Sequence, residues 1–255
     1  MIRIGRCVSL SERFDALCGE AAAYGYAYLE LALRSLEELS AEELARARET
    51  AEEHGLEIYS TNLFLPGRLS FFDADKSALY AYAHSVLVKA ASLGVRVAVL
   101  GAGDARRRPA GMAEVTAEAW LLEAFKALAD IASGYGVIIA LEPLNKLETN
   151  MITTTAQALE YISLVGHPHL RLLIDYYHFC MEREDPAIIQ RAGPVLAHTH
   201  LATPLDRQFP SPERAGEYRG FFEALRHSGY RGGMSVECDF SGEAAAGGVH
   251  HLPAR

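Results

Sequence analysis

Short apolar runs recur about every 30 residues along the chain, and each is followed by a longer stretch of helical character with charged and alanine-rich faces. The runs are rich in Val, Ile, Leu and Tyr, and their length and composition are typical of strands. Eight such runs are present, at residues 2–8, 26–33, 56–62, 95–103, 137–144, 170–177, 195–202 and 233–240. The pattern therefore predicts a strict alternation of strand and helix.

The stretches between the runs carry the signals with which helices begin and end. Residues 40–55 open with Ser40, and Glu43 follows at the spacing of a capping box. This stretch and two others, 77–94 and 112–136, end at a glycine, which readily adopts the left-handed conformation after a helix. We therefore expect helices over all three.

Strict alternation of strand and helix implies parallel strands joined by right-handed crossovers, and eight such units in about 250 residues suit a closed (β/α)8 barrel. An open doubly wound sheet is the alternative. It would more usually carry a glycine-rich phosphate-binding turn after the first strand, and SLSERF at 9–14 is not one. We predict a single (β/α)8 TIM barrel domain over 1–255, with the glycine-broken tail 241–255 as a short or irregular eighth helix.

Composition and charge narrow the function classes. Half of the 255 residues are hydrophobic and 22% are charged, as in ordinary globular proteins. No run reaches the roughly 20 apolar residues of a membrane helix, so we expect a cytoplasmic protein with no membrane partner. The net charge is −9 and only residues 105–109 are locally basic, which argues against nucleic acid as a partner. The four cysteines form no CxxC pair and suggest neither disulfides nor a thiolate zinc site.

Four of the later strands carry a polar side chain where the strand ends, namely Glu142, Asp175, His200 and Glu237. Barrel strands end at the face that holds active sites, and period-two alternation continues each of these residues on an inward row. Any one of them alone is more often a satisfied polar core residue. Three carboxylates at one mouth, however, repel unless a cation or protons relieve them. The set suits one divalent ion, Mn²⁺, Mg²⁺, Co²⁺ or Zn²⁺, whereas His198 lies deeper and is expected to hydrogen-bond inside the barrel.

The last four strands also carry motifs in a recognisable order. EPLNKLE (142–148) follows the fifth strand, DYYH (175–178) the sixth, HTH (198–200) lies in the seventh and VECD (236–239) in the eighth. With these motifs the chain resembles the xylose isomerase-like TIM barrels, and in particular the sugar isomerase/epimerase branch that includes ketose 3-epimerases and hydroxypyruvate isomerase. The resemblance covers nearly the whole chain and is densest after Val137.

The resemblance implies a divalent-metal-dependent isomerase or epimerase of a small sugar or sugar-like keto substrate, working through a metal-stabilised enediolate. It implies that Glu142 and Glu237 are metal ligands and also the catalytic acid/base pair, and that Asp175 and His200 complete the metal shell. The chemistry fits these residue types, because a proton beside a carbonyl is too weakly acidic for a carboxylate alone and needs Lewis-acid assistance. Transfer across opposite faces of one carbon gives an epimer, and transfer between adjacent carbons gives an aldose-ketose isomer.

The resemblance further implies that Glu148 and His178 contact substrate hydroxyls, with His178 in a loop just past the sixth strand. Arg207 is the nearest match to an arginine of the epimerases, although its loop carries an extra residue. Glu30 and Asn62, at the ends of the second and third strands, are additional candidates for sugar contacts; a loop salt bridge and a turn explain them equally well. Relatives are often dimers or tetramers, so a homo-oligomer is compatible with the family.

Two loops have weaker signals. Residues 101–112 are glycine-rich and basic and suit a substrate phosphate or carboxylate, although a solvated charged loop is slightly favoured. Residues 63–72 are apolar and suit either a pocket wall or plain packing.

Three other functions compete with the isomerase. An inosose-type dehydratase, which is a lyase, could use similar ligands. An apurinic endonuclease needs further histidines on the early strands, which are missing, and a DNA partner that the acidic charge disfavours. A metal-free sugar-binding or regulatory barrel would not need all four ligand types.

Overall fold

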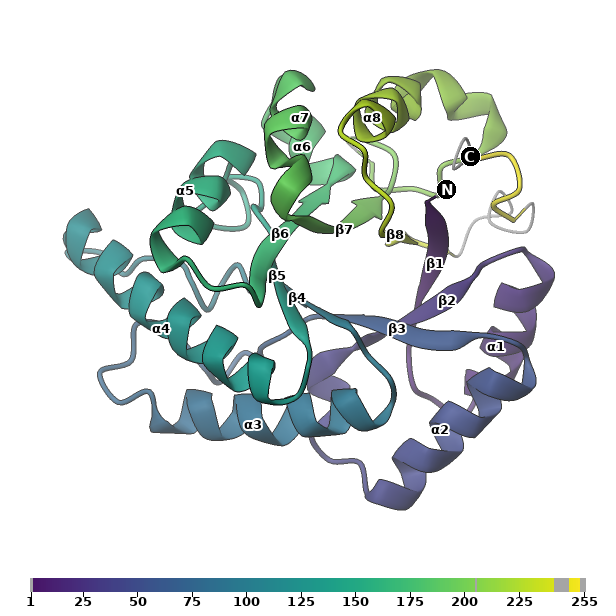
Figure 1. Cartoon of the computed structure of the whole chain (residues 1–255), viewed down its shortest axis with the longest axis horizontal. Coiled ribbons are helices and arrows are strands. Elements are labelled where there is room, and N and C mark those ends of the chain that lie inside the picture. The colour runs from purple at the N-terminus through teal and green to yellow at the C-terminus, as the bar shows by residue number, and fades with distance from the viewer. Residues whose placement is uncertain (1, 205, 241–247, 253–255) are drawn as a thin grey trace.

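All eight apolar runs form strands in the computed structural model, which describes residues 2–204, 206–240 and 248–252. The strands are β1 (Arg3–Val8), β2 (Tyr28–Ala32), β3 (Glu57–Asn62), β4 (Val97–Leu100), β5 (Ile138–Leu141), β6 (Leu170–Asp175), β7 (Leu196–Leu201) and β8 (Gly233–Val236). Each strand pairs in parallel with its neighbours in sequence, and β8 pairs with β1, so that the sheet closes (Figure 1). The predicted (β/α)8 TIM barrel is confirmed.

Helices surround the strands on the outside of the barrel (Figure 1). They are α1 (Phe14–Ala23), α2 (Ala41–Glu53), α3 (Ser77–Ser92), α4 (Glu114–Gly134), α5 (Thr155–Val165), α6 (Tyr176–Met181), α7 (Ala187–Ala192) and α8 (Ala215–His227), with short 3₁₀ segments η1 (Leu33–Leu36), η2 (Gly193–Val195) and η3 (Pro212–Arg214). Two short helices, α6 and α7, stand between β6 and β7. The predicted tail helix lies largely outside the described residues.

Helix ends follow the sequence signals. At the start of α2, the Ser40 side chain accepts a hydrogen bond from the Glu43 backbone N–H and the Glu43 carboxylate accepts one from Ser40 N–H, so the predicted capping box is confirmed. Gly55 follows this helix with φ of 72°, in the left-handed region. No helix among the described residues is long and apolar enough to cross a membrane.

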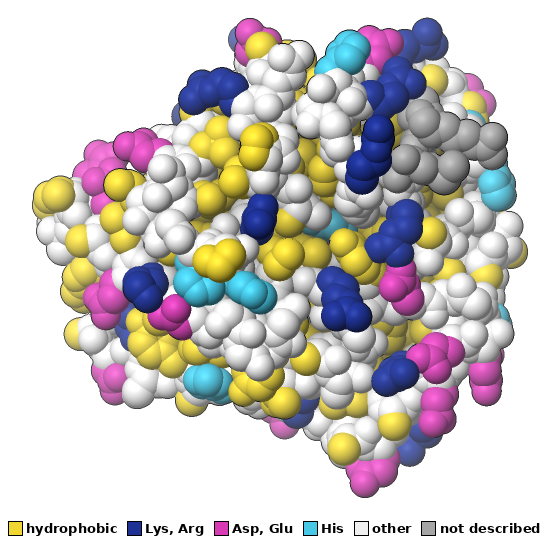
Figure 2. All heavy atoms as spheres, in the orientation of Figure 1, with side chains coloured by type: hydrophobic (Ala, Val, Ile, Leu, Met, Phe, Trp, Pro, Cys, Tyr) yellow, Lys and Arg dark blue, Asp and Glu magenta, His cyan; other side chains and the backbone are white. Residues whose placement is uncertain are grey.

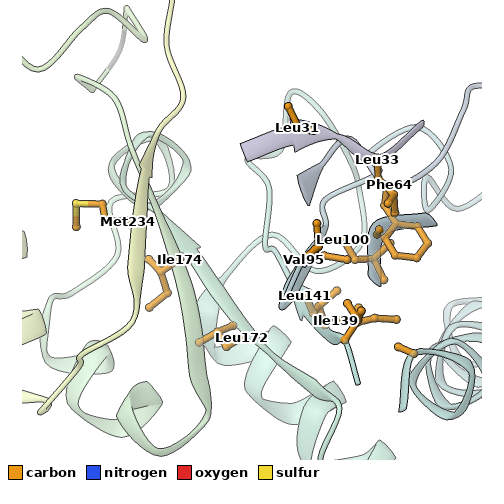
Figure 3. Close-up of a cluster of buried hydrophobic side chains, with 14 of the residues drawn as sticks. Leu31, Leu33, Phe64, Val95, Leu100, Ile139, Leu141, Leu172, Ile174 and Met234 are labelled. Atoms are coloured by element: carbon orange, nitrogen blue, oxygen red, sulfur yellow. The ribbon is translucent and has the colours of Figure 1, made fainter. Parts of the chain in front are cut away.

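Most of the core lies between the barrel and the helices (Figure 3). In β2, alternation turns Leu29 and Leu31 toward the helices and Glu30 toward the barrel axis, and all three are fully buried. On the face shown in Figure 2, charged side chains are spread among apolar ones. A second, smaller cluster of Val97, Val99, Ala140 and Leu173 is also buried, whereas Glu142 and Asp175 come later, at the carboxyl ends of β5 and β6.

The predicted strands continue too far at their carboxyl ends. The run 95–103 forms a strand only to Leu100, and the run 170–177 only to Asp175. Beyond these residues the chain leaves the sheet to build the barrel mouth. His178, expected in a loop, lies instead in α6, where the Asp175 carboxylate accepts a hydrogen bond from Tyr177 N–H as the N-terminal cap.

Candidate metal and substrate site

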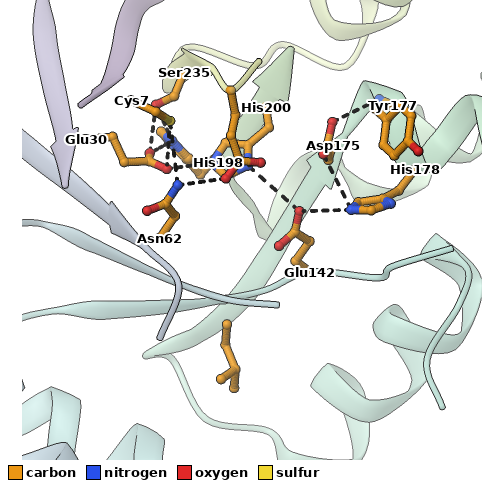
Figure 4. A network of polar contacts seen from close by, with 12 residues as sticks. Cys7, Glu30, Asn62, Glu142, Asp175, Tyr177, His178, His198, His200 and Ser235 are labelled. Carbon is orange, nitrogen blue, oxygen red and sulfur yellow. Dashed lines mark hydrogen bonds and ion pairs between the residues drawn. The ribbon is translucent and has the colours of Figure 1, made fainter. Parts of the chain in front are cut away.

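Four side chains converge at the carboxyl ends of the last four strands. Glu142 follows β5, Asp175 ends β6, His200 lies near the end of β7 and Glu237 follows β8, and one ligand atom from each lies within 4.8 Å of all the others. Sheet register brings two of them together, because Asp175 and His200 are paired partners across β6 and β7. Figure 4 shows Glu142, Asp175 and His200 pointing toward one another. The structure thus assembles all four predicted metal ligands.

Two buried atoms of this cluster need a partner. Glu142 Oε1 and His200 Nδ1 are shielded from solvent, and neither has a hydrogen-bond partner among the described residues. Buried polar atoms without partners are rare in proteins because they forfeit their interaction with water. A divalent cation is the partner that three carboxylates and one imidazole suit best. The residues therefore fit a metal ion on their own chemistry.

Glu142 and Glu237 have opposite electrostatic surroundings. Burial raises the pKa of the Glu142 carboxyl to about 8, and the Glu237 and Asp175 charges add to this rise although His200 opposes it. Burial acts in the same direction at Glu237, but His200 and Arg207 outweigh it and hold its pKa at about 2. Paired carboxyl groups whose pKa values are driven apart are typical of an acid and a base in one active site.

A buried carboxylate fixes the orientation of His200. Its Nε2 lies 2.8 Å from Glu30 Oε1, while its Nδ1 faces the cluster, 3.3 Å from Glu237 Oε2 and 3.8 Å from Glu142 Oε1. With the Nε2 side of the ring facing the Glu30 carboxylate, the Nδ1 atom is turned toward the cluster, an arrangement common among metal-binding histidines.

Glu30 therefore lies beneath the site and not at its rim. Its Oε2 atom accepts hydrogen bonds from Ser60 Oγ at 2.5 Å and Ser235 Oγ at 2.7 Å, and lies 2.8 Å from His198 Nε2 (Figure 4). The side chain is fully buried and is not among the residues that line the cavity, so the sugar contact expected of Glu30 stays a prediction. The expectation that His198 hydrogen-bonds inside the barrel is confirmed.

A cavity of about 270 Å³ lies over the cluster, between the loops after β3 and β4 and the ends of β5 and β8. The other predicted substrate residues line it: Asn62, Glu148, His178 and Arg207. Part of the loop 63–72 also forms its wall, at residues 63–67. The polar lining comes both from the ends of strands, as at Asn62 and Glu142, and from the loops that carry Glu148 and Arg207.

Arg207 bridges the acidic groups of the site. Its Nη2 atom lies 2.5 Å from Glu237 Oε2 and 3.5 Å from Asp175 Oδ2, and its Nη1 atom lies 3.9 Å from Glu148 Oε1. The guanidinium also stacks over the Tyr177 ring at 4.9 Å. These contacts place a fixed positive charge at the wall of the cavity.

His178 is held by a residue that the sequence interpretation missed. The Asn145 amide nitrogen lies 2.8 Å from His178 Nδ1, and the Asn145 backbone N–H donates to the same atom at 3.3 Å. The opposite ring atom, Nε2, lies 3.6 Å from Asp175 Oδ2 and 3.9 Å from Glu142 Oε1. Asn145 belongs to the EPLNKLE motif, which is the signal that could have pointed to it.

Gly101 was missed as well. A Cβ atom at this position would lie 2.5 Å from Glu142 Oε2, so the glycine leaves room for the carboxylate. The signal in the sequence was the glycine-rich start of the segment 101–112.

A family model described as "Xylose isomerase-like TIM barrel" matches residues 18–254. The chain belongs to this family. A D-psicose 3-epimerase of Agrobacterium fabrum (strain C58 / ATCC 33970) is 24% identical over 236 residues, which are 89% of this chain and 80% of that protein. An L-ribulose 3-epimerase of Methylomonas sp. (strain DH-1) is 28% identical over 239 residues, 89% of this chain and 78% of that protein.

Solved structures of the family have the same fold. A crystal structure of D-psicose 3-epimerase in the presence of D-fructose superposes with a TM-score of 0.82 at 21% identity, over 96% of this chain and 88% of that chain. The predicted resemblance to the xylose isomerase-like barrels is thereby confirmed.

Proposed function

We propose that the protein is a divalent-metal-dependent epimerase or isomerase of a small ketose or related keto sugar. The observation that carries the proposal is the convergence of Glu142, Asp175, His200 and Glu237 beneath a cavity of about 270 Å³. The chain is an enzyme of the sugar isomerase and epimerase class, to which its named relatives belong. The relatives that act on psicose and ribulose support a ketose as the substrate.

The four converging residues would hold the ion. Glu142, Asp175 and Glu237 supply hard oxygen ligands and His200 supplies Nδ1, a set that accepts Mn²⁺, Mg²⁺, Co²⁺ or Zn²⁺. When bound, such an ion polarises a carbonyl group and makes the neighbouring carbon-bound proton more acidic.

Glu142 and Glu237 would transfer the proton. They project from β5 and β8, which are separated by β6 and β7 on one side of the barrel and by β1 to β4 on the other. They therefore approach a substrate from different sides. One glutamate removes the proton from a carbon beside the carbonyl, and the other returns a proton to the opposite face, which inverts the configuration at that carbon.

The remaining polar groups of the cavity would orient the substrate. His178 Nε2 and the Glu148 carboxylate suit hydroxyl groups as partners, and Arg207 suits an oxygen that gains negative charge. Asn62 donates to Glu237 Oε1 at 2.7 Å, and this contact fixes the carboxylate of the proposed acid/base residue.

The test is an assay of the protein over a panel of ketoses in D₂O, after removal of bound metal and reloading with each of the four ions. We expect an epimer or isomer of unchanged composition that carries deuterium on one carbon, and no turnover with chelator present. A product lighter by one water would identify a dehydratase instead. Absence of both turnover and deuterium exchange with every ketose and ion would contradict the proposal.

A further inference from the structure

Three consecutive arginines in the loop after β4 have different environments. Arg106 is fully buried and is the largest fully buried side chain among the described residues, whereas the Arg107 side chain is 43% exposed. The sequence favoured a solvated loop here, or one that receives an anion. The structure instead turns Arg106 inward, behind the wall of the substrate cavity.

The Arg106 guanidinium donates to main-chain carbonyl oxygens. Its Nη2 atom lies 2.6 Å from Glu142 O and 3.4 Å from Ile152 O, its Nε atom 3.2 Å from Met151 O, and its Nη1 atom 3.4 Å from Leu100 O. Among the described residues no carboxylate lies within ion-pair distance of it. A buried guanidinium is costly, so these four acceptors define the position of the side chain closely.

Glu142 needs such a donor because of its place in the chain. Its backbone N–H donates to Leu100 O at 3.1 Å and continues the β4–β5 ladder by one residue. β5 ends at Leu141, and no backbone N–H among the described residues donates to the Glu142 carbonyl. Arg106 fills this gap, and both main-chain polar groups of Glu142 are then fixed.

Arg106 also fixes the return of the loop that carries Glu148. Ile152 O, one of its acceptors, also accepts from Leu144 N–H at 3.3 Å and so closes the loop on itself. Ile152 has φ of 58° and Ala102, which accepts from the Arg106 backbone N–H, has φ of 48°. Such left-handed conformations persist in non-glycine residues only when surrounding contacts impose them.

We propose that Arg106 is a positioning residue, which holds the main chain of Glu142 and of the Glu148 loop so that both carboxylates face the cavity. The inference rests on the proposed function, since the value of this placement lies in the roles assigned to Glu142 and Glu148. Arg106 itself touches neither substrate nor ion. It acts through the backbone of the residues that do.

The test compares Arg106→Met, Arg106→Lys and the control Arg48→Met, which removes an exposed arginine of α2 that does not line the substrate cavity. Thermal unfolding first shows which variants are folded. Calorimetry of these variants then gives the Mn²⁺ dissociation constant, and steady-state assays give kcat and KM. For Arg106→Met we expect Mn²⁺ affinity to fall about 10-fold, as for lost support of a ligand. We expect kcat to fall about 100-fold, since misplacement by about 1 Å has that effect, with KM little changed.

Lysine has three donors but no planar fork, so Arg106→Lys should fall between the wild type and Arg106→Met. In Arg106→Ala, added ethylguanidinium should restore part of both Mn²⁺ affinity and kcat, and ethylammonium should restore less. Arg48→Met should behave as the wild type.

Wild-type Mn²⁺ affinity and kcat in folded Arg106→Met would overturn the inference. So would an activity loss in Arg106→Lys that equals its unfolded fraction while the folded fraction binds Mn²⁺ normally. If the wild-type protein turns over no ketose, the proposed function fails by itself. Mn²⁺ affinity and its rescue by ethylguanidinium still decide the role of Arg106 in that case.

Discussion

At the scale of single residues, three glutamates of the site show how environment separates chemically identical side chains. Glu30 is saturated by hydrogen bonds beneath the site, Glu142 is buried with one oxygen lacking a partner, and Glu237 is paired with Arg207. Glu30 lies against His200, whereas Glu142 and Glu237 line the cavity.

Replacing either glutamate of the proposed acid/base pair should stop the reaction. Glu142→Gln and Glu237→Gln keep the side-chain volume but remove the group that accepts a proton, so we expect turnover to fall by about 10³-fold or more. The measurement is kcat together with solvent deuterium exchange, and circular dichroism checks the fold. Glu57→Gln, at an exposed ion pair with Arg3 at the start of β3, is the control. Normal activity in either site variant would refute the assigned mechanism.

Replacing Glu30 should weaken metal binding without entering the cavity. In Glu30→Gln the negative charge facing His200 Nε2 is lost, so the imidazole becomes a poorer ligand and Mn²⁺ affinity should fall by about 10- to 100-fold. Calorimetric titration measures this affinity. Ser60→Ala, which removes one hydrogen bond to Glu30 and keeps the charge, should have a smaller effect. Equal Mn²⁺ affinity in Glu30→Gln and wild type would show that Glu30 does not support His200.

Gly101 tests the space around Glu142 by sterics alone. The Cβ atom in Gly101→Ala would meet Glu142 Oε2 at 2.5 Å, so the carboxylate must move and kcat should fall by about 10-fold or more. Gly67 lines the same cavity, and a Cβ there meets nothing within 4 Å. Gly67→Ala should therefore keep its activity. Equal kcat in the two variants would argue against a tightly placed Glu142.

At the scale of elements, strands and helices contribute to different properties of the protein. The ends of β5 to β8 each deliver one residue to the cluster, whereas helices such as α2 contribute to stability from the outer ring. α6 is an exception, because this single short helix follows β6 directly and places His178 in the cavity wall. Stability and activity should therefore respond to different substitutions.

The capping box of α2 offers a test of this division. Ser40→Ala removes the acceptor of the Glu43 N–H and should lower the free energy of unfolding by about 1 kcal/mol. Urea denaturation measures the loss, and kcat should not change because α2 lies away from the cavity. Ser40→Thr keeps the hydroxyl and should lose less. A large fall in kcat for folded Ser40→Ala would contradict the separation.

At the scale of the whole molecule, folding, protonation and metal binding are linked through Glu142. Its pKa is raised from the ordinary value of 4.5 to about 8, so the folded protein holds this proton more tightly than the unfolded chain. The stability from this group is fully present below pH 4.5 and is lost as pH rises toward about 8. A bound cation favours the ionised carboxylate and reverses this loss.

The Tm increase produced by Mn²⁺ should therefore grow from about pH 6 to about pH 8, because protons compete with the ion for Glu142 and His200. Thermal scans with Mn²⁺ and with chelator at several pH values measure it. In Glu142→Gln the dependence should flatten. A Tm increase that shrinks as pH rises would contradict the linkage.

Local signals in the sequence predicted much of the molecule. The eight strands and the capping box at Ser40 depend on residues close together in the chain, so periodicity and spacing reveal them. The four candidate ligands Glu142, Asp175, His200 and Glu237 could also be placed at the mouth of the barrel, because side-chain alternation and the end of a parallel strand fix which face and which rim each residue occupies.

Only the tertiary structure decided how the neighbouring elements support those ligands. Glu30 lies under His200, His178 enters a helix, and Arg106 is buried against the carbonyl of Glu142. The Arg106–Glu142 and Glu30–His200 contacts join residues 36 and 170 positions apart, and they depend on strand register and on where each loop returns. The sequence by itself determined which residues reach the mouth of the barrel. Packing between distant segments decided which side chains surround those residues. The reason is that these contacts depend on distances between segments far apart in the chain, which no local sequence pattern encodes.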